Sequence, residues 1–392
     1  MKYNFDKIIN RKGTNSFKWD AGEILVKIGY ADKFNDETIP LFVADMDFEC
    51  PQPVLDALRK TVDQQMFGYT TQMTSSEYYS ALKNWFKRRQ NWEIEDNQII
   101  YCPGTVHALI MAIRAFTKPD EKVIIQQPVY APFYKTVVDN GRTVVNNELL
   151  NDNGFYTIDF NDLEEKAKDE KTTLMFFCSP HNPVGRIWTK QELKKVAEIC
   201  ENNNVILVSD EIHSDLIRTN ETFFPIADVS DLQNVVVCTA INKTFNLAGL
   251  HCSNIIIKNR LLRAQFQKEL GMKSPSPFEI NALISAYNEG EEWLEQLNEY
   301  LDENFDFLEK FLTEKMPKVK YRRPEGTYLA WLDFSDYNLP EEEIHKRIYT
   351  DANVILQDGK AFGEKCSLFQ RICLPTPRSI IEKAMNRISE QF

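Results

Sequence analysis

Six short apolar runs, rich in Val and Ile, recur through the middle of the 392-residue chain and limit its possible folds. They are residues 98–102, 122–126, 174–178, 205–209, 235–239 and 254–257. Both faces of each run are apolar, as in strands buried in a parallel sheet. Helical patterns lie between them, among them residues 105–116 and residues 189–202, where Thr189 and Glu192 have capping-box spacing. This alternation predicts an α/β fold with a mostly parallel sheet flanked by helices.

The pattern changes after about residue 285. Residues 289–315 are strongly charged and carry one apolar helical stripe, formed by Trp293, Leu297, Leu301 and Phe305. Strand-like segments at 328–334, 354–357 and 369–374 follow, and then a terminal helix from Ser379. We therefore expect a large α/β domain at residues 45–285 and a smaller α+β domain formed by residues 1–44 and 286–392.

Charge and hydropathy exclude several kinds of partner. Lys plus Arg is 46 and Asp plus Glu is 58, which gives a net charge of −12. Such a chain is unsuited to nucleic-acid backbones and to anionic membranes. No run approaches the roughly eighteen apolar residues of a spanning helix, and the N-terminus lacks the apolar core of a secretory signal. We therefore expect a cytoplasmic protein that binds neither nucleic acid nor membrane.

Cysteine and histidine positions argue against disulfide and metal frameworks. The eight cysteines are scattered, several of them inside the apolar runs, and no Cys-x-x-Cys pair occurs. This distribution is typical of buried, reduced thiols. The five histidines are dispersed without metal-ligand spacing. No metal site is expected.

Candidate ligand-binding residues follow the predicted strands, at the edge where open α/β sheets bind ligands. Gly104-Thr105-Val106 opens a helix after the first run, and free N–H groups there suit a phosphate. The residues after the later runs are Tyr130, Asn182, Asp210 with His213, and Lys243. Each has an ordinary alternative when taken alone, because a tyrosine can pack in the core, an aspartate can cap a helix and a lysine can extend to solvent.

Together these residues match the requirements of pyridoxal phosphate. This cofactor needs a lysine for a Schiff base, a carboxylate for its ring nitrogen, a phosphate site, a ring to stack on and a donor to its phenolic oxygen. A nicotinamide dehydrogenase is disfavoured because no Gly-x-Gly occurs in the chain. A P-loop enzyme is disfavoured because Gly-x-x-x-x-Gly-Lys is absent.

The sequence resembles the fold-type-I pyridoxal-phosphate enzymes of the class I/II aminotransferase superfamily, over about residues 13–387. Its Asn182-Pro183-Val184-Gly185 and Asp210-Glu211 motifs are similar to those of the superfamily. The stretches Val43-Ala44-Asp45-Met46-Asp47-Phe48 and Lys243-Thr244-Phe245-Asn246-Leu247-Ala248-Gly249-Leu250 resemble the MalY/PatB branch of cystathionine β-lyases and C–S lyases. The resemblance implies a seven-stranded, mostly parallel sheet and a smaller α+β domain.

The resemblance also implies roles for the cofactor-binding residues. Lys243 would form the Schiff base with pyridoxal 5′-phosphate, Asp210 would pair with the ring nitrogen, and Tyr130 would stack on the ring. Asn182 would donate to the phenolic oxygen, and His213 would assist it. The phosphate would be bound by Gly104, Thr105, Val106, Thr239, Asn242 and, from the neighbouring subunit of a homodimer, Tyr69.

The substrate would be an amino acid whose α-carboxylate binds Arg371, with Asn182 and Asp45 as further contacts. Some positions depart from the family pattern: Ile241 and Asn242 replace a common Pro and hydroxyl residue, and Cys373 stands where Asn is usual. Phe42 and His107 also differ, standing where Trp and Pro are common. Loops near residues 17–19, 43–48 and 357–362 would shape the pocket that receives the leaving group.

The resemblance implies α,β-elimination from cystathionine or another cysteine S-conjugate, which gives a thiol, pyruvate and ammonia. Lys243 would act as the general base at Cα. The same residues serve transamination, so an aminotransferase is the alternative reading. A third reading is a regulatory protein that retains the cofactor but acts through a partner.

Overall fold

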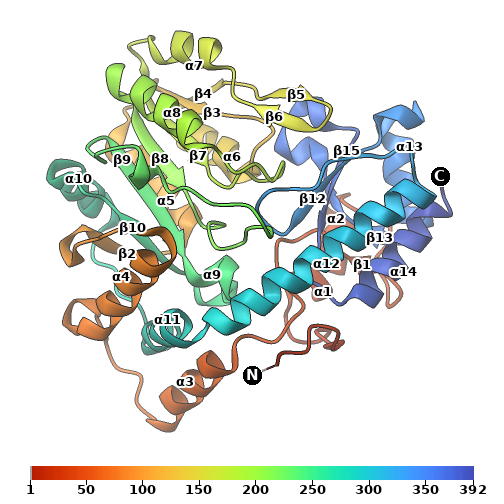
Figure 1. Cartoon of the computed structure of the whole chain (residues 1–392), viewed down its shortest axis with the longest axis horizontal. Helices are drawn as coiled ribbons and strands as arrows, with labels where there is room; N and C mark the ends of the chain where they lie inside the picture. The colour runs from red at the N-terminus through yellow and green to blue at the C-terminus, as the bar shows by residue number, and fades with distance from the viewer. Residues whose placement is uncertain (1) are drawn as a thin grey trace.

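The computed structural model describes residues 2–392, and a seven-stranded sheet lies at its centre (Figure 1). Across the sheet the strands are β2 (Ile99–Pro103), β10 (Cys252–Ile256), β9 (Val235–Ala240), β8 (Ile206–Asp210), β7 (Thr172–Cys178), β3 (Lys122–Ile125) and β4 (Thr143–Asn146). The strands from β4 to β9 are parallel, and β10 runs antiparallel to both β9 and β2. The expectation of a mostly parallel seven-stranded sheet is confirmed.

Side chains of each central strand alternate between two apolar layers. In β7, Leu174 and Phe176 belong to one buried cluster, whereas Met175 and Phe177 belong to the other. All four are fully buried, as expected for a strand with helices on both faces. The sheet is therefore the middle of three layers.

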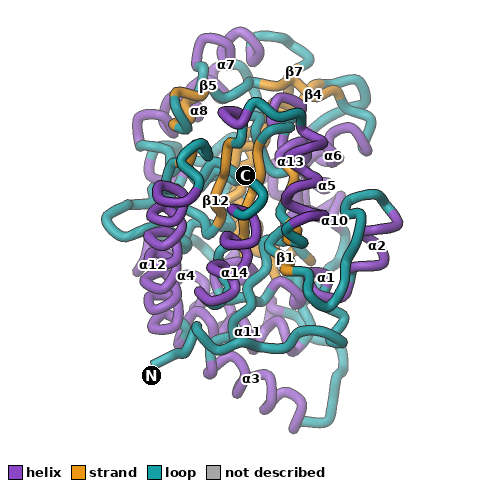
Figure 2. The backbone as a smooth tube through the Cα atoms, turned by 90° about the vertical axis from the view of Figure 1, so that its right-hand side faces the viewer, coloured by secondary structure: helices purple, strands orange, loops and turns teal. Residues whose placement is uncertain are grey.

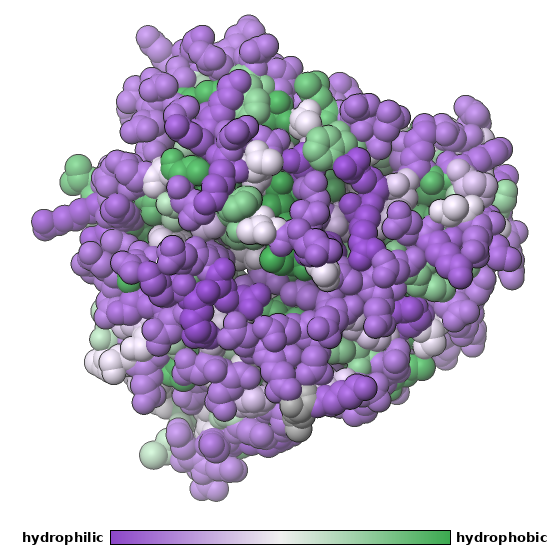
Figure 3. Space-filling model, in the orientation of Figure 1, coloured by the Kyte–Doolittle hydropathy of each residue, from purple (hydrophilic) through white to green (hydrophobic). Residues whose placement is uncertain are grey.

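Helices cover both faces of the sheet (Figure 1). One face packs against α5 (Thr105–Phe116), α6 (Ala131–Asp139) and α10 (Arg260–Leu270). The other packs against α4 (Ser76–Gln90), α7 (Phe160–Ala167), α8 (Lys190–Asn202) and α11 (Pro277–Glu289), with α3 (Gln52–Asp63) against α11. The predicted capping box is present at α8, where the side chains of Thr189 and Glu192 each bond to the other residue's backbone N–H. Hydrophilic residues cover most of the face seen in Figure 3, because this layering buries the large apolar side chains.

A second group of elements combines the segments after the long helix α12 (Glu291–Lys315) with the N-terminal segments of the chain (Figure 2). A four-stranded antiparallel sheet contains β11 (Lys320–Tyr321), β12 (Leu329–Asp333), β15 (Phe369–Cys373) and β14 (Gln357–Asp358). The other members are α13 (Glu341–His345), α14 (Arg378–Ser389), α1 (Phe17–Asp20), α2 (Gly22–Lys27) and the parallel pair β1 (Ile39–Pro40) and β13 (Val354–Ile355). A separate hairpin joins β5 (Leu150–Asp152) to β6 (Phe155–Thr157).

The apolar clusters follow the proposed division into two domains in part, since one cluster beside the large sheet also includes Leu329, Trp331 and Cys373. One cluster joins Leu25 and Phe42 to Leu308, Ile372 and residues of α14. The other two flank the seven-stranded sheet. The stripe on α12 is buried and serves both regions, since Trp293 and Leu301 pack toward the large sheet and Phe305 toward the C-terminal cluster. We retain residues 45–285, with 1–44 and 286–392, as the proposed large and small domains.

A tight loop between the two regions depends on a glycine. Gly185 has φ +72°, its N–H donates to the His181 carbonyl (2.7 Å), and its carbonyl accepts from Glu325 and Gly326 (2.9 Å each). A Cβ at this position would lie 2.2 Å from Cβ of Pro324. Both the conformation and the close approach therefore require glycine.

Replacing Gly185 with alanine should lower the free energy of unfolding by about 2–4 kcal/mol, because backbone strain adds to the clash. Urea denaturation measures the loss. Gly141→Ala is the matched control: Gly141 has φ +70° but no atom within 4 Å of its Cβ position, so about 1 kcal/mol is expected. Equal losses in the two variants would contradict the role of the Pro324 contact.

Candidate active site

The carboxyl ends of β2, β7, β8 and β9 lie at one edge of the central sheet. The strands β7, β8 and β9 are parallel neighbours. Because β10 runs antiparallel to both β9 and β2, β2 ends at this edge too. The segments after these strands carry the residues predicted from the sequence: Gly104, Asn182, Asp210 and Lys243. Strand direction thus brings together residues that are far apart in the chain.

A cavity of about 230 Å³ collects most of the predicted catalytic residues. Its lining residues are Phe17, Phe42, Val43, Ala44, Tyr130, Cys178, Asn182, Asp210, Ile212, His213, Lys243, Gln357 and Arg371. Six of these were expected to bind cofactor or substrate: Tyr130, Asn182, Asp210, His213, Lys243 and Arg371. Each of the three loops expected to shape the pocket supplies at least one lining residue: Phe17; Val43 and Ala44; and Gln357. The cavity is therefore the candidate active site.

Asp210 presents a buried carboxylate at the end of β8. Burial raises the pKa of this carboxyl from 3.8 to about 7, although the Ile212 N–H and the Lys243 ammonium oppose the rise. The Ile212 N–H donates to one carboxylate oxygen at 3.3 Å. A cationic or N–H group of a ligand would favour the charged form further. Asp210 therefore suits a partner such as a protonated ring nitrogen.

Lys243 supplies the amine of the site. It lies in the short helix α9 (Ile241–Thr244) after β9, and its Nζ donates to the Ala44 carbonyl at 2.7 Å. Burial lowers the pKa of Lys243, and the nearby Arg371 guanidinium lowers it too, while Cys373, Asp45 and Asp210 oppose the shift. A lowered pKa makes more of the unprotonated amine present, which is the form that attacks a carbonyl carbon or accepts a proton.

Arg371 supplies a second cation to the cavity lining. This residue of β15 is 3% exposed, donates from Nη1 to Oδ1 of Asn182 (3.2 Å) and from Nη2 to the Phe42 carbonyl (2.7 Å). Its guanidinium lies over the Phe362 ring at 4.9 Å. Its Nε is buried without a hydrogen-bond partner among residues 2–392. An unpaired buried donor of this kind favours a ligand oxygen, and a carboxylate fits the guanidinium fork.

The aromatic and imidazole side chains complete the cavity wall. Burial raises the pKa of Tyr130, so its hydroxyl is neutral at physiological pH. Burial lowers the pKa of His213 to about 3, with further lowering from Lys243 and Arg371. His213 is therefore a neutral imidazole, and its Nδ1 has no partner within the described part of the chain. Such an atom can bond to a polar ligand atom.

The predicted phosphate residues lie outside this cavity, at neighbouring strand ends. Gly104 has φ +99° and opens α5, and no described side chain caps the first N–H groups of that helix. The Thr105 hydroxyl bonds to Ser253 (3.1 Å), and the Thr239 hydroxyl donates to the Asn254 carbonyl (2.8 Å).

Three other residues predicted to bind cofactor or substrate do not line the cavity. Asn242 has a buried side-chain oxygen without a partner among residues 2–392. The Asp45 carboxylate does not line the cavity but binds Arg11 at 2.6 Å. Tyr69 is fully exposed and also does not line it. The structure of one chain therefore does not bring Asp45 or Tyr69 into the pocket.

Two residues near the site, Lys18 and His251, were not among the residues predicted to bind cofactor or substrate. Lys18 is fully buried and binds the Asp47 carboxylate at 2.6 Å. His251 has its Nδ1 3.8 Å from the position of a Cβ at Gly104. Neither lies after a predicted strand in the way that identified the other candidates, because Lys18 comes from the N-terminal segment and His251 from the turn before β10.

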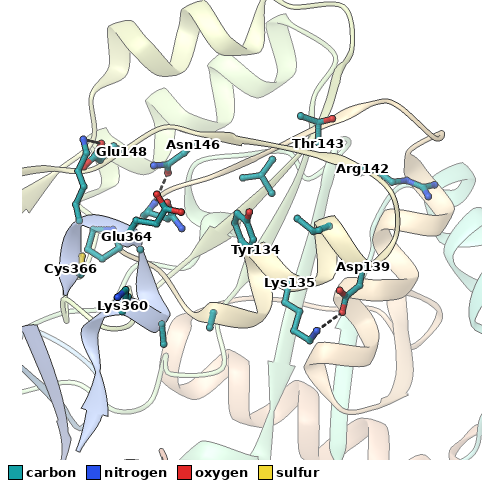
Figure 4. Close-up of a pocket in the computed structure, with 18 residues that line it drawn as sticks. Tyr134, Lys135, Asp139, Arg142, Thr143, Asn146, Glu148, Lys360, Glu364 and Cys366 are labelled. Carbon is teal, nitrogen blue, oxygen red and sulfur yellow. Dashed lines mark hydrogen bonds and ion pairs between the residues drawn. The ribbon is translucent and has the colours of Figure 1, made fainter. Parts of the chain in front are cut away.

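A larger groove of about 1000 Å³ lies outside the candidate site, between α6, β4 and residues 360–366 (Figure 4). Its lysines are engaged: Lys135 pairs with Asp139 (2.9 Å), and Lys365 with Glu148 (2.5 Å). None of the residues predicted to bind cofactor or substrate lines it. The groove has a larger volume than the cavity, but it contains none of the candidate reactive residues.

Other kinds of site find no support in the structure. Within residues 2–392, no three side chains of His, Cys, Asp or Glu gather as they would around a metal ion. No helix of the described chain has the length and apolar character needed to cross a membrane. All eight cysteines are free, and seven of them are buried.

The raised pKa of Asp210 predicts a gain in stability on its neutralisation. Because the folded-state pKa exceeds the unfolded value of 3.8, stability falls as pH rises from about 4 to about 7. Asp210→Asn should raise the free energy of unfolding of the ligand-free protein at pH 8, by up to about 4 kcal/mol, and by less at pH 5. Denaturant titrations at the two pH values measure the change.

Asp36→Asn is the control for this effect. Asp36 is exposed, and hydrogen bonding to Lys12 lowers the pKa of its carboxyl, so no gain at pH 8 is expected. A gain from Asp210→Asn that is the same at pH 5 and pH 8 would contradict the raised pKa of Asp210.

Comparison with known proteins agrees with the motifs and the fold. The sequence model of the family "Aminotransferase class I and II" matches residues 36–388. Cystathionine beta-lyase PatB of Bacillus subtilis is 41% identical, with 98% of each chain covered. Cystalysin of Treponema denticola, whose crystal structure contains a pyridoxal 5′-phosphate cofactor, is 36% identical, with TM-score 0.94 and coverage of 100% of this chain and 99% of that one.

A further solved structure is similar over the whole chain. The pyridoxal-phosphate-bound C–S lyase of Staphylococcus hominis is 34% identical, with TM-score 0.92, and the alignment covers 100% of this chain and 98% of that one. The family match, the full-length similarity to PatB and the fold together show that the chain belongs to the class I and II aminotransferase family, in the branch that includes PatB.

Proposed function

We propose that the protein is a pyridoxal-phosphate-dependent carbon–sulfur β-lyase that cleaves cystathionine or another cysteine S-conjugate. The observation that carries the proposal is the meeting of Lys243, Asp210 and Arg371 in one cavity of about 230 Å³. The names of the relatives, a cystathionine beta-lyase and a C–S lyase, support this choice of reaction. The products would be a thiol, pyruvate and ammonia.

The donor set of the site fits pyridoxal phosphate. Lys243 would bind the aldehyde carbon of the cofactor, Asp210 its ring nitrogen, and Tyr130 one face of its ring. The uncapped N-terminus of α5, from Gly104 to Val106, fits the phosphate, because free N–H groups and the helix dipole favour an anion. The unpartnered atoms of His213 and Asn242 provide further polar contacts for a ligand.

Pyridoxal phosphate, when bound, supplies an electron sink for the charge that develops at the substrate Cα. Arg371 would bind the α-carboxylate through its fork, which fixes the orientation of the Cα–H bond. The Lys243 amine would accept the proton from Cα, and its lowered pKa favours that role. The Asp210 carboxylate would stabilise the positive charge on the ring nitrogen. The Cβ substituent would leave as a thiolate that takes up a proton, and water would hydrolyse the remaining three-carbon product to pyruvate and ammonia.

Transamination is the second candidate, because the same residues would serve it and the family as a whole bears the aminotransferase name. The two reactions separate in their requirements. Elimination needs a sulfur leaving group at Cβ and no keto acid. Transamination needs an acceptor keto acid and leaves the carbon–sulfur bond intact.

The direct test is pyruvate release from L-cystathionine by the purified protein with pyridoxal phosphate and no keto acid. We expect sustained pyruvate formation, with one free thiol per pyruvate, measured with lactate dehydrogenase and a thiol reagent. Protein treated with a carbonyl reagent to remove the cofactor is the control and should be inactive. Turnover only with added keto acid, and without thiol release, would establish transamination instead.

We further propose that the working unit is a homodimer in the cytoplasm. Met66, Phe67 and Tyr69 are close in the chain and exposed, and the Phe67 ring stacks on that of Phe278 (5.4 Å). Such a region favours a second copy of the chain, whose site Tyr69 could then reach. Free and mostly buried cysteines suit a reducing compartment. Light scattering that gives the mass of one chain for the active protein would contradict the dimer.

A further inference from the structure

Residues 42–48, here called the strap, contribute three residues to the lining of the candidate site. Side chains donate hydrogen bonds to the backbone carbonyls of five of its seven residues. The Phe42 carbonyl accepts from Arg371 (2.7 Å), and the Ala44 carbonyl from Lys243 (2.7 Å) and Tyr328 (3.0 Å). The carbonyls of Asp45, Met46 and Phe48 accept from Lys18 (3.2 Å), Arg11 (2.9 Å) and Asn246 (2.8 Å). The strap therefore joins the two reactive cations to the N-terminal segment.

A buried ion cluster whose residues do not line the cavity anchors the strap. Lys18 is fully buried and donates from Nζ to the Asp47 carboxylate at 2.6 Å. The other oxygen of Asp47 accepts from Arg11 (2.9 Å) and from the indole of Trp19 (2.8 Å). Burial acts to lower the pKa of Lys18, but Asp47, with contributions from Cys373 and Asp45, raises it, and the net shift is upward. Lys18 is therefore a charged ammonium held in the protein interior, and such a group requires a fixed partner.

The side chains that donate hydrogen bonds to the strap have different roles in the proposed reaction. Lys243 must turn from the Ala44 carbonyl to the cofactor and the substrate. Arg371 must turn part of its fork to the α-carboxylate. Lys18 does not line the cavity and has no place in the reaction. It can hold the strap while the other two are engaged.

The position of the strap matters because Phe42, Val43 and Ala44 form one wall of the cavity. Within residues 2–392, two hydrogen bonds orient the Arg371 fork, one to Asn182 and one to the Phe42 carbonyl. A shift of the strap would therefore turn the fork away from the carboxylate.

We propose that Lys18, through Asp47 and the Asp45 carbonyl, is a positioning residue that sets the strap so that Arg371 meets the substrate carboxylate. The inference rests on the proposed function, because it assumes that an amino acid is the ligand of Arg371. It adds a residue outside the cavity to those that determine substrate affinity.

The test is Lys18→Met, which removes the ammonium but keeps the length of the side chain. KM for the cysteine S-conjugate should rise about tenfold or more, as for loss of a hydrogen bond to a charged group. The value of kcat should change much less, and the affinity for pyridoxal phosphate, measured by absorbance titration, should stay within about threefold. Lys12→Met is the matched control, because Lys12 pairs with Asp36 in the same segment but near the surface. It should change neither KM nor kcat.

The double variant Lys18→Met/Asp47→Asn separates positioning from a purely structural role. Lys18→Met leaves the Asp47 charge with one cation fewer, so its melting temperature should fall, and neutralising Asp47 should recover part of that loss. The positioning role predicts that KM stays raised in the double variant. Recovery of KM together with the melting temperature would overturn the proposal, and so would an unchanged KM in Lys18→Met.

Binding of L-alanine, followed by the absorbance change of the bound cofactor, distinguishes failure of this inference from failure of the proposed function. Alanine has the α-carboxylate but no leaving group, so its dissociation constant reports on Arg371 without turnover. A dissociation constant raised about tenfold in both Lys18 variants supports the positioning role even if the wild-type protein releases no pyruvate. An unchanged constant overturns it, whatever reaction the protein performs.

Discussion

In the ligand-free chain, the hydrogen bond between Nζ of Lys243 and the Ala44 carbonyl holds the candidate site together. It joins the end of β9 to the strap that precedes the large sheet, and thereby places an amine from one region against the backbone of another. The Phe42 carbonyl ties Arg371 to the same strap. One short backbone segment thus orients the side chains proposed to bind cofactor and substrate, and the buried Lys18–Asp47 pair fixes that segment in turn.

Burial of ionisable groups in the cavity lowers the stability of the ligand-free fold. Burial brings the pKa of Asp210 up to about 7 and lowers that of Lys243, so both charges are disfavoured before a ligand arrives. A ligand that carries a ring N–H, an aldehyde and an anion would stabilise these buried groups. Binding energy at the site therefore comes partly from groups that the fold alone leaves poorly satisfied.

Sequence patterns predicted the central fold because buried parallel strands are continuous apolar runs. Residues 105–116 were predicted as a helix and form α5 with the same bounds. The edge strand β4 was missed, because its residues are partly exposed and too few to stand out. The candidates Asn182, Asp210 and Lys243 were found because they lie at or just after strand ends, whereas Arg371, which lies within β15, was identified only through the family resemblance. Lys18 could not be found in this way, because its importance comes from a long-range pairing with Asp47, 29 residues away, that no local spacing encodes.

The central claim is that Lys243 is the base at the substrate Cα, and its most direct test is exchange of the α-hydrogen of L-alanine in D₂O, followed by proton NMR. Alanine has no leaving group, so exchange reports on proton transfer alone. The wild-type protein with pyridoxal phosphate should replace the α-hydrogen by deuterium, whereas Lys243→Ala, with the cofactor still bound, should lose about 10²-fold or more of that rate. Exchange at the wild-type rate in Lys243→Ala would contradict the account, because another group would then be moving the proton.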